Sequence, residues 1–137
     1  MGSAFYSNFS MRKLVDNNKA NAGLVCDPNA GGGSIGTSAG GGFGGIHFHA
    51  QKGESVACRL KSDPAERFDE ARMIAALQSD VEKALNDSRA KITDRGHPGP
   101  VSFYFGYTLQ NIQGRVQVSG QRIGGDYYSL DADLSER

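Results

Sequence analysis

The clearest pattern along the chain is an alternation of apolar and polar residues over positions 101–134. Side chains on a strand point alternately to opposite faces, so this spacing predicts three strands that share one buried face. The inward positions are Val101, Phe103, Phe105, Tyr107 and Leu109, then Ile112, Val116 and Val118, then Tyr128, Leu130, Ala132 and Leu134.

Two turns join these strands and determine their register. A two-residue turn at 110–111 places Phe105 beside Val116 and Tyr107 across from Gly114, where an aromatic ring can cover the strand glycine. A three-residue loop at 124–126, or a five-residue loop in the same register, keeps the apolar residues of the last strand on the same face.

A helical period runs through residues 64–93. Asp63 can cap the helix, Pro64 suits its first position, and residues 94–98 stop it. The positions on one apolar arc are Ala71, Ile74, Leu77, Val81, Ala84, Leu85 and Ile92.

Residues 46–61 predict a hairpin. Two alternating runs flank a turn at 51–53, which would pair Phe48 with Val56 and Ile46 with Cys58. Cys58 would then be a buried thiol that packs in the core.

The first 45 residues divide into two parts. Residues 1–30 suggest a short helix with Ser10 as its N-cap, and residues 1–3 are either native or an expression remnant. Residues 31–45 hold nine of the 19 glycines and predict a flexible loop or linker. A phosphate-binding loop is disfavoured, because the run lacks the Lys-Ser/Thr ending and no helical pattern follows it.

These elements predict an α+β domain over residues 46–137, preceded by the N-terminal segment and the Gly-rich run. Its order is β-β-α-β-β-β, with a mainly antiparallel five-stranded sheet packed on one long helix. The order resembles that of cystatin-like and other helix-on-sheet rolls, in topology only.

Charge and composition limit the classes of binding partner and the cellular setting. The 137 residues carry 15 basic and 15 acidic side chains, and this balance argues against nucleic acid. No apolar run is long enough to cross a membrane. Cys26 and Cys58 are too sparse for a disulfide framework, so we expect a reducing, cytoplasmic setting, although one bridge is compatible with the sequence and a removed leader would leave no trace.

Three histidines suggest a divalent-metal site. His47 and His49 are two apart on a predicted strand and therefore project from one face, and His97 is a candidate third ligand. The simpler interpretation is two exposed strand histidines, and no cofactor is required.

The polar face of the last three strands is the second candidate site. It carries Tyr104, Arg115, Tyr127 and Asp131, of which Tyr and Arg are residue types enriched at recognition surfaces. A plain solvated face, a ligand-binding concavity and a dimer surface are all compatible with this pattern.

Catalysis has weaker support. His97, Asp94, Asp126 and Cys26 lie on predicted loops and could form an acid–base or nucleophilic pair, but no local signature of a nucleophile is present.

We therefore expect a small soluble binding or interaction module that self-associates as a homodimer and does not catalyse a reaction. The alternatives are a small-molecule carrier or enzyme with a cavity between helix and sheet, a metal-binding module that uses His47 and His49, and a module that binds another protein.

Overall fold

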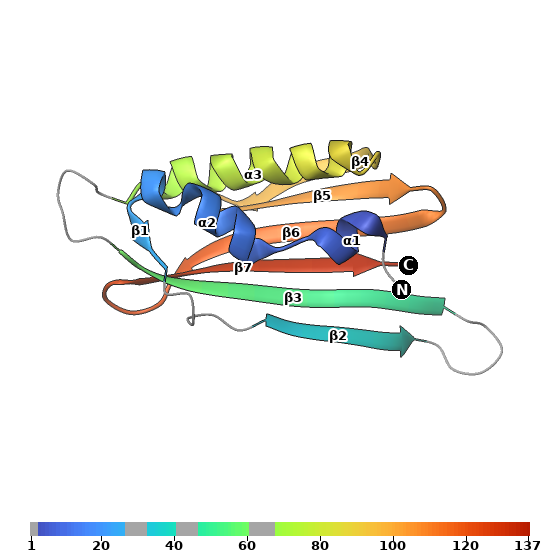
Figure 1. Ribbon diagram of the computed structural model, residues 1–137, viewed down its shortest axis with the longest axis horizontal. Helices are drawn as coiled ribbons and strands as arrows, with labels where there is room; N and C mark the ends of the chain where they lie inside the picture. Colours follow the sequence, from blue (N-terminus) through green and yellow to red (C-terminus); the bar gives the residue numbers. More distant parts are fainter. Residues whose placement is uncertain (1–2, 27–32, 41–46, 61–67) are drawn as a thin grey trace.

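The structure is a computed structural model that describes residues 3–26, 33–40, 47–60 and 68–137. Figure 1 shows the helices on one side of a long sheet. The helices are α1 (Ala4–Asn8), α2 (Met11–Ala22) and α3 (Glu70–Asp87). The strands are β1 (Leu24–Val25), β2 (Gly33–Gly40), β3 (His47–Leu60), β4 (Lys91–Gly99), β5 (Ser102–Leu109), β6 (Ile112–Arg122) and β7 (Tyr127–Glu136).

Among the residues described, the sheet has seven strands, and every pair of neighbours runs antiparallel. Six strands follow the order β1-β3-β7-β6-β5-β4, and β2 lies beside β3 outside this path. The α+β class, the antiparallel sheet and the helix packed on it are confirmed. The strand number of five was wrong, and the sheet is open in this order rather than an evident roll.

The register of the C-terminal strands is confirmed. Phe105 pairs with Val116, and Tyr107 pairs with Gly114. The β6–β7 hairpin closes where the Ile123 amide donates to the Tyr127 carbonyl oxygen at 3.1 Å, which leaves the predicted three-residue loop. The inward positions of β5 are buried, as are Val116 and Val118 of β6 and the named residues of β7.

Helix α3 is shorter than predicted at its C-terminal end. It ends at Asp87, and Arg89 adopts a left-handed conformation with φ 63°, which turns the chain back toward the sheet. Ile92 therefore lies on β4, paired with Tyr107, and residues 94–98 belong to that strand instead of forming a turn. Ile92 has the spacing of the helix's apolar arc only by coincidence. It is partly buried because it packs against the core from the edge strand β4.

The start of α3 also differs. Asp69 is the N-cap and accepts a hydrogen bond from the Arg72 amide at 3.0 Å, in the role that we predicted for Asp63. Asp63 and Pro64 lie outside the described residues.

The hairpin predicted at 46–61 was wrong. Strand β3 runs without a turn through 51–53, because β7 pairs with it continuously from Ala50–Glu136 to Arg59–Tyr127. On its other side, residues 33–40 of the Gly-rich run form β2 and pair with 47–54, where we expected a loop. The rest of that run, like Ile46, lies outside the described residues.

The N-terminal segment forms two helices instead of one. Ser3 caps α1, and its hydroxyl oxygen accepts from the Tyr6 amide at 3.2 Å. Ser10 caps α2 as predicted and accepts from the Lys13 amide at 3.3 Å.

The two cysteines form a disulfide, which the sequence left open, so Cys58 is buried as predicted but is not a free thiol. β1 pairs Leu24 with Leu60 and Val25 with Arg59, and Cys26 stands in the next register position, opposite Cys58. The Cα atoms are 4.3 Å apart. The bridge ties the end of the N-terminal segment to β3, next to the edge of the sheet.

Candidate functional site

The sheet face opposite the helices is the candidate functional surface. In Figure 1 α1, α2 and α3 all lie on one side, and no described element covers the other. We call this uncovered side the outer face. Odd-numbered positions of β3, β6 and β7 point to it, because their even-numbered neighbours Val56, Val116 and Leu130 are buried beneath the helices.

A cavity of about 360 Å³ opens at one end of the outer face, where β7 ends and β6 begins. Its lining residues are Gln51, Gln113, Gly114, Arg115, Ser135, Glu136 and Arg137. Cross-strand pairing aligns Gln51, Ser135 and Arg115 in one row, and both backbone hydrogen bonds between Gln113 and Arg137 continue the β6–β7 ladder. We call this region the Glu136 end of the sheet.

Arg115 is held in place at the edge of this cavity. Its guanidinium lies 4.3 Å from the centre of the Tyr104 ring, and its Nη2 donates to the Gln117 Oε1 at 3.3 Å. The Tyr104 hydroxyl donates to Asp94 at 3.3 Å. Gly96 leaves room for the Tyr104 ring, because a Cβ at that position would lie 2.6 Å from Cε1 of the ring. Tyr104 therefore positions Arg115 over the sheet.

Glu136 is a buried carboxylate, 3% exposed, on the inner side of the same end. It accepts hydrogen bonds of 2.6 Å from both the backbone amide and the hydroxyl of Ser3, and a third from the Tyr107 hydroxyl. Gly114 stands between Tyr107 and Glu136 in the sheet, and only a residue without a side chain lets the Tyr107 ring cross to the carboxylate. Burial, together with the hydrogen bond to Glu136, raises the pKa of Tyr107 well above its usual value.

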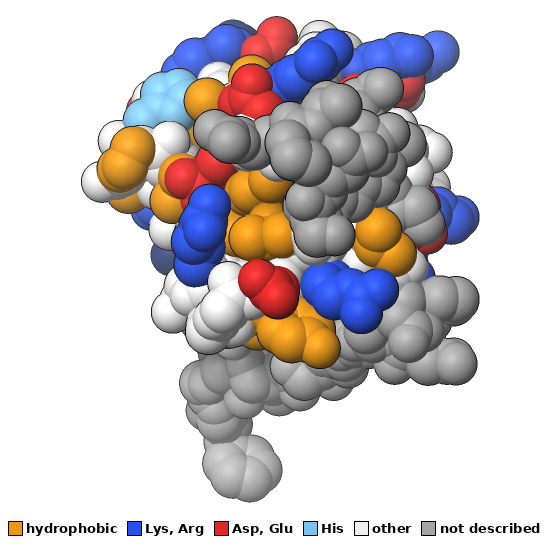
Figure 2. Space-filling model, turned by 90° about the vertical axis from the view of Figure 1, so that its left-hand side faces the viewer, with side chains coloured by type: hydrophobic (Ala, Val, Ile, Leu, Met, Phe, Trp, Pro, Cys, Tyr) orange, Lys and Arg blue, Asp and Glu red, His pale blue; other side chains and the backbone are white. Residues whose placement is uncertain are grey.

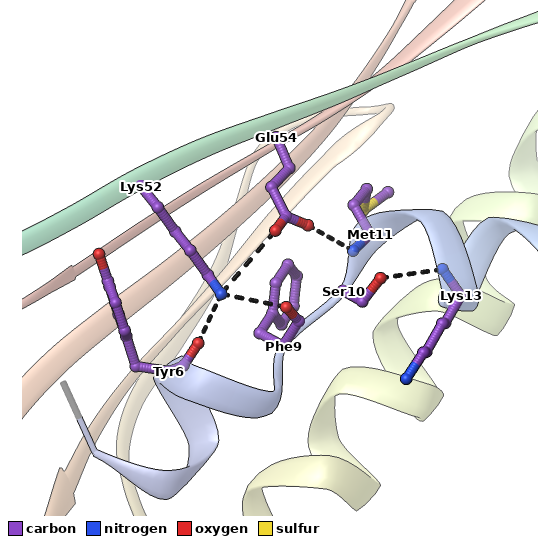
Figure 3. A network of polar contacts seen from close by, with 7 residues as sticks. All are labelled: Tyr6, Phe9, Ser10, Met11, Lys13, Lys52 and Glu54. Carbon is purple, nitrogen blue, oxygen red and sulfur yellow. Dashed lines mark hydrogen bonds and ion pairs between the residues drawn. The ribbon is translucent and has the colours of Figure 1, made fainter. Parts of the chain in front are cut away.

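Lys52 is the second buried charge at this end, 7% exposed. Figure 3 shows its ammonium directed between α1 and the start of α2. Its Nζ donates to the carbonyl oxygens of Tyr6 at 2.5 Å and Phe9 at 3.0 Å, and lies 3.8 Å from a carboxylate oxygen of Glu54. The other Glu54 oxygen accepts from the Met11 amide at 2.6 Å. This pair holds the α1–α2 junction on the sheet, so its role is structural.

The opposite end of the outer face carries exposed apolar side chains. Val25, Ile123 and Tyr127 are the exposed large hydrophobic residues of the described chain, at 44%, 42% and 52%. Val25 pairs with Arg59, Arg59 pairs with Tyr127, and Tyr127 bonds to Ile123, so the four side chains form one row across β1, β3, β7 and the end of β6. We call it the Tyr127 row. Figure 2, which looks onto this end of the molecule, shows hydrophobic side chains exposed between charged ones.

Between the two ends, the outer face carries short polar side chains on β3 and β7. Asp131 accepts hydrogen bonds from the hydroxyls of Ser55 and Ser129, the latter at 3.1 Å. Asp133 follows it on the same face and is exposed.

The structure separates the four residues predicted for this face. Tyr104 and Arg115 meet at the Glu136 end, Tyr127 stands at the other end, and Asp131 lies between them. The sequence reasoning missed Glu136 and Arg137 as members of the cavity. Their strand alternation continues that of β7, and extending the pattern by two residues would have found them.

The predicted metal and catalytic residues gain no support from the geometry. The side chains of His47 and His49 are outside the described set, and Nε2 of His97 lies 3.5 Å from the Gln78 amide nitrogen. Within the described part of the chain, no three potential ligands come together. Cys26 is bonded to Cys58 and is not a free nucleophile, and Asp94 accepts a hydrogen bond from the Tyr104 hydroxyl.

Across the described helices, none combines the length and the apolar character that a membrane span requires. Comparison with models of protein families, with curated proteins and with solved structures found no match.

Proposed function

We propose that the protein is a non-catalytic binding module that associates with a second copy of itself through the outer face. The Tyr127 row carries this proposal. The three large hydrophobic side chains left exposed in the described chain stand together on the sheet face that no described helix covers. Clustered exposed apolar residues within a polar surround are typical of an interaction surface.

The charges of the outer face favour a second copy as the partner. Arg59 and Arg115 stand toward the two ends, and Asp131 and Asp133 lie between them on β7. A second copy related by a two-fold axis that passes between the Tyr127 row and the acidic centre would bring Arg59 of one protomer over the acidic centre of the other. In that arrangement opposite charges face each other across the interface.

Light scattering over a concentration series tests the proposal. The wild-type protein should show twice the 14.6 kDa mass of the chain, and the double variant Tyr127→Asp/Ile123→Asp should show the single mass. Ser79→Asp, which adds a charge on the exposed side of α3, is the matched control and should leave the dimer intact. A wild-type protein that stays at the single mass at every concentration would overturn self-association.

We also infer that the chain matures in an oxidising compartment. The cytoplasmic location expected from the sequence rested on unpaired cysteines, and the Cys26–Cys58 bond favours the opposite, since stable disulfides persist mainly outside the cytosol. Thiol labelling of protein taken directly from its native cells tests this: no labelling before reduction supports the inference, and full labelling contradicts it.

A further inference from the structure

We propose that the Cys26–Cys58 disulfide regulates self-association by holding β1 in the Tyr127 row. This inference rests on the proposed function, because it concerns control of the surface through which two copies associate. The oxidised chain presents the complete row. Reduction of the bond by a dithiol releases β1 and removes Val25 from the row.

The first observation is the position of the bond beside the row. Val25 pairs with Arg59, and Arg59 pairs with Tyr127. In the next register position of β1 and β3, Cys26 is bonded to Cys58. Side chains alternate along a strand, so the exposed Val25 points to the outer face and the buried Cys26 points inward. The bond therefore fixes β1 from beneath, directly beside the exposed valine.

The second observation is how little else holds β1 on the sheet. Its two residue pairs with β3 compare with the ten pairs that join β3 to β7. β1 is the last strand of its path through the sheet, and no other described strand pairs with it. Apart from the disulfide, these two pairs and the buried side chain of Leu24 hold it in place. Local opening is favoured where few hydrogen bonds and contacts must break.

The third observation is the burial of both cysteines, which links reduction to the opening of β1. Cys26 is 4% exposed and Cys58 is 1% exposed. A thiolate must reach one sulfur of a disulfide directly, so β1 has to move away from β3 before the bond can be attacked.

The exchange reaction itself transfers two electrons and two protons. One thiolate of the dithiol attacks a protein sulfur, breaks the S–S bond and forms a mixed disulfide. The second thiol of the reductant then displaces the protein sulfur. Cys26 and Cys58 are left as thiols, and the reductant is left as a cyclic disulfide.

Release of β1 changes the association surface while the rest of the row stays in place. Tyr127 and Ile123 remain, because β7 is paired with both β3 and β6. A dimer with two-fold symmetry would lose two partly exposed valine side chains, one from each protomer. We expect this loss of apolar contact to weaken the dimer about tenfold or more.

Light scattering of the full chain over a concentration series, with and without dithiothreitol, tests the proposal. The oxidised wild type should dimerise, and the reduced protein should require about tenfold or more higher concentration to do so. Cys26→Ala/Cys58→Ala should show the weaker association in both conditions. Val25→Ser keeps the disulfide and should weaken association similarly without any reductant. Ser79→Asp, on the exposed side of α3, is the control and should respond to dithiothreitol as the wild type does.

Two further measurements locate the effect of reduction. Amide hydrogen exchange of residues 24–26 should become faster in the reduced protein, while residues 50–57 of β3, which pair with β7, should keep their protection. Far-ultraviolet circular dichroism should show that the sheet persists after reduction.

The outcomes separate this inference from the function on which it rests. A single mass for the oxidised wild type at every concentration overturns both. Equal affinity in the two redox states, with a dimer in each, overturns the regulation and leaves self-association standing. Loss of the sheet spectrum on reduction also overturns the regulation, because the disulfide would then hold the whole fold and not β1 alone.

Discussion

The two ends of the sheet are held together by different chemistry. At the Tyr127 end a covalent bond, Cys26–Cys58, joins the N-terminal segment to β3. At the Glu136 end the same segment is held by hydrogen bonds to two buried charges, Glu136 and Lys52. Both devices fasten α1 and α2 over the sheet, one at each limit of the segment.

The difference shows which conditions each end tolerates. A disulfide stabilises largely by restricting the unfolded chain, and only a reductant removes it. A buried carboxylate stabilises only while all its donors are in place, because desolvation makes each lost partner costly. The Tyr127 end is therefore sensitive to redox conditions, and the Glu136 end is sensitive to single substitutions.

Removal of the disulfide should have the largest effect. The loop that it closes spans 32 residues, for which chain entropy gives about 3–4 kcal/mol. We expect Cys26→Ala/Cys58→Ala to lower the free energy of unfolding by that amount in urea titrations. Reductant should lower the wild type similarly and leave the variant unchanged. A wild type that unfolds at the same urea concentration with and without reductant would contradict this account.

Loss of the buried carboxylate should rank next. Glu136→Ala leaves the Ser3 amide, the Ser3 hydroxyl and the Tyr107 hydroxyl without an acceptor, and should cost about 2–3 kcal/mol of unfolding free energy. Asp133→Ala, an exposed carboxylate three residues away, is the control and should change stability by less than about 0.5 kcal/mol. Similar losses for both variants would show that Glu136 does not fasten this end.

Two glycines allow the same substitution to be made at both ends. Gly114 lies against the ring of Tyr107, and Gly120 lies against Tyr128, whose hydroxyl donates to Glu70 on α3. A methyl group at either position would overlap the tyrosine ring, so Gly114→Ala and Gly120→Ala should each cost about 1–2 kcal/mol. Gly99→Ala, where the nearest side-chain atom is 3.3 Å away, is the control for the loss of a strand glycine. If all three variants lose the same free energy of unfolding, the close contacts with the tyrosine rings do not set the cost of the substitution.

Alkaline pH should produce the smallest effect. Burial, strengthened by Glu136 and Glu70 respectively, raises the folded-state pKa of Tyr107 and of Tyr128. The stability that these two tyrosines contribute is fully present below the unfolded-state pKa of about 10. It is lost as the pH rises from there toward the folded-state pKa. At pH 10 each tyrosine should account for about 0.4 kcal/mol of lost stability relative to neutral pH.

Urea titrations at pH 8 and pH 10 measure this loss. The double variant Tyr107→Phe/Tyr128→Phe should lose less stability over that interval than the wild type. Equal losses would show that these two hydroxyls do not titrate differently on folding.

Local patterns predicted the C-terminal half of the fold well. The meander from β5 to β7 is joined by tight turns, so the alternation of Phe103, Phe105 and Val118 was enough to set both register and buried face. Pairings between distant segments were not predictable in this way. No local signal indicated that β7 would pair with residues 50–59, and that pairing removes the predicted hairpin.

The candidate site divides along the same line. The residue types and the outward positions of Tyr104 and Arg115 followed from strand alternation. Their stacking, and the cavity that Arg115 forms with Gln51 and Arg137, depended on which strands became neighbours. Gln51 reached the cavity only because β3 is one continuous strand.

The sequence by itself determined the class of the fold, the central part of α3 and the register of the last three strands, because each depends on periodicity or turn chemistry within a few residues. The tertiary structure alone decided the seven-stranded order, the Cys26–Cys58 bond and the burial of Glu136 and Lys52. These features join residues up to 133 positions apart, such as Ser3 and Glu136. Contacts between such distant residues depend on which of many alternative strand pairings is most stable across the whole chain. A local pattern of a few residues does not determine that outcome.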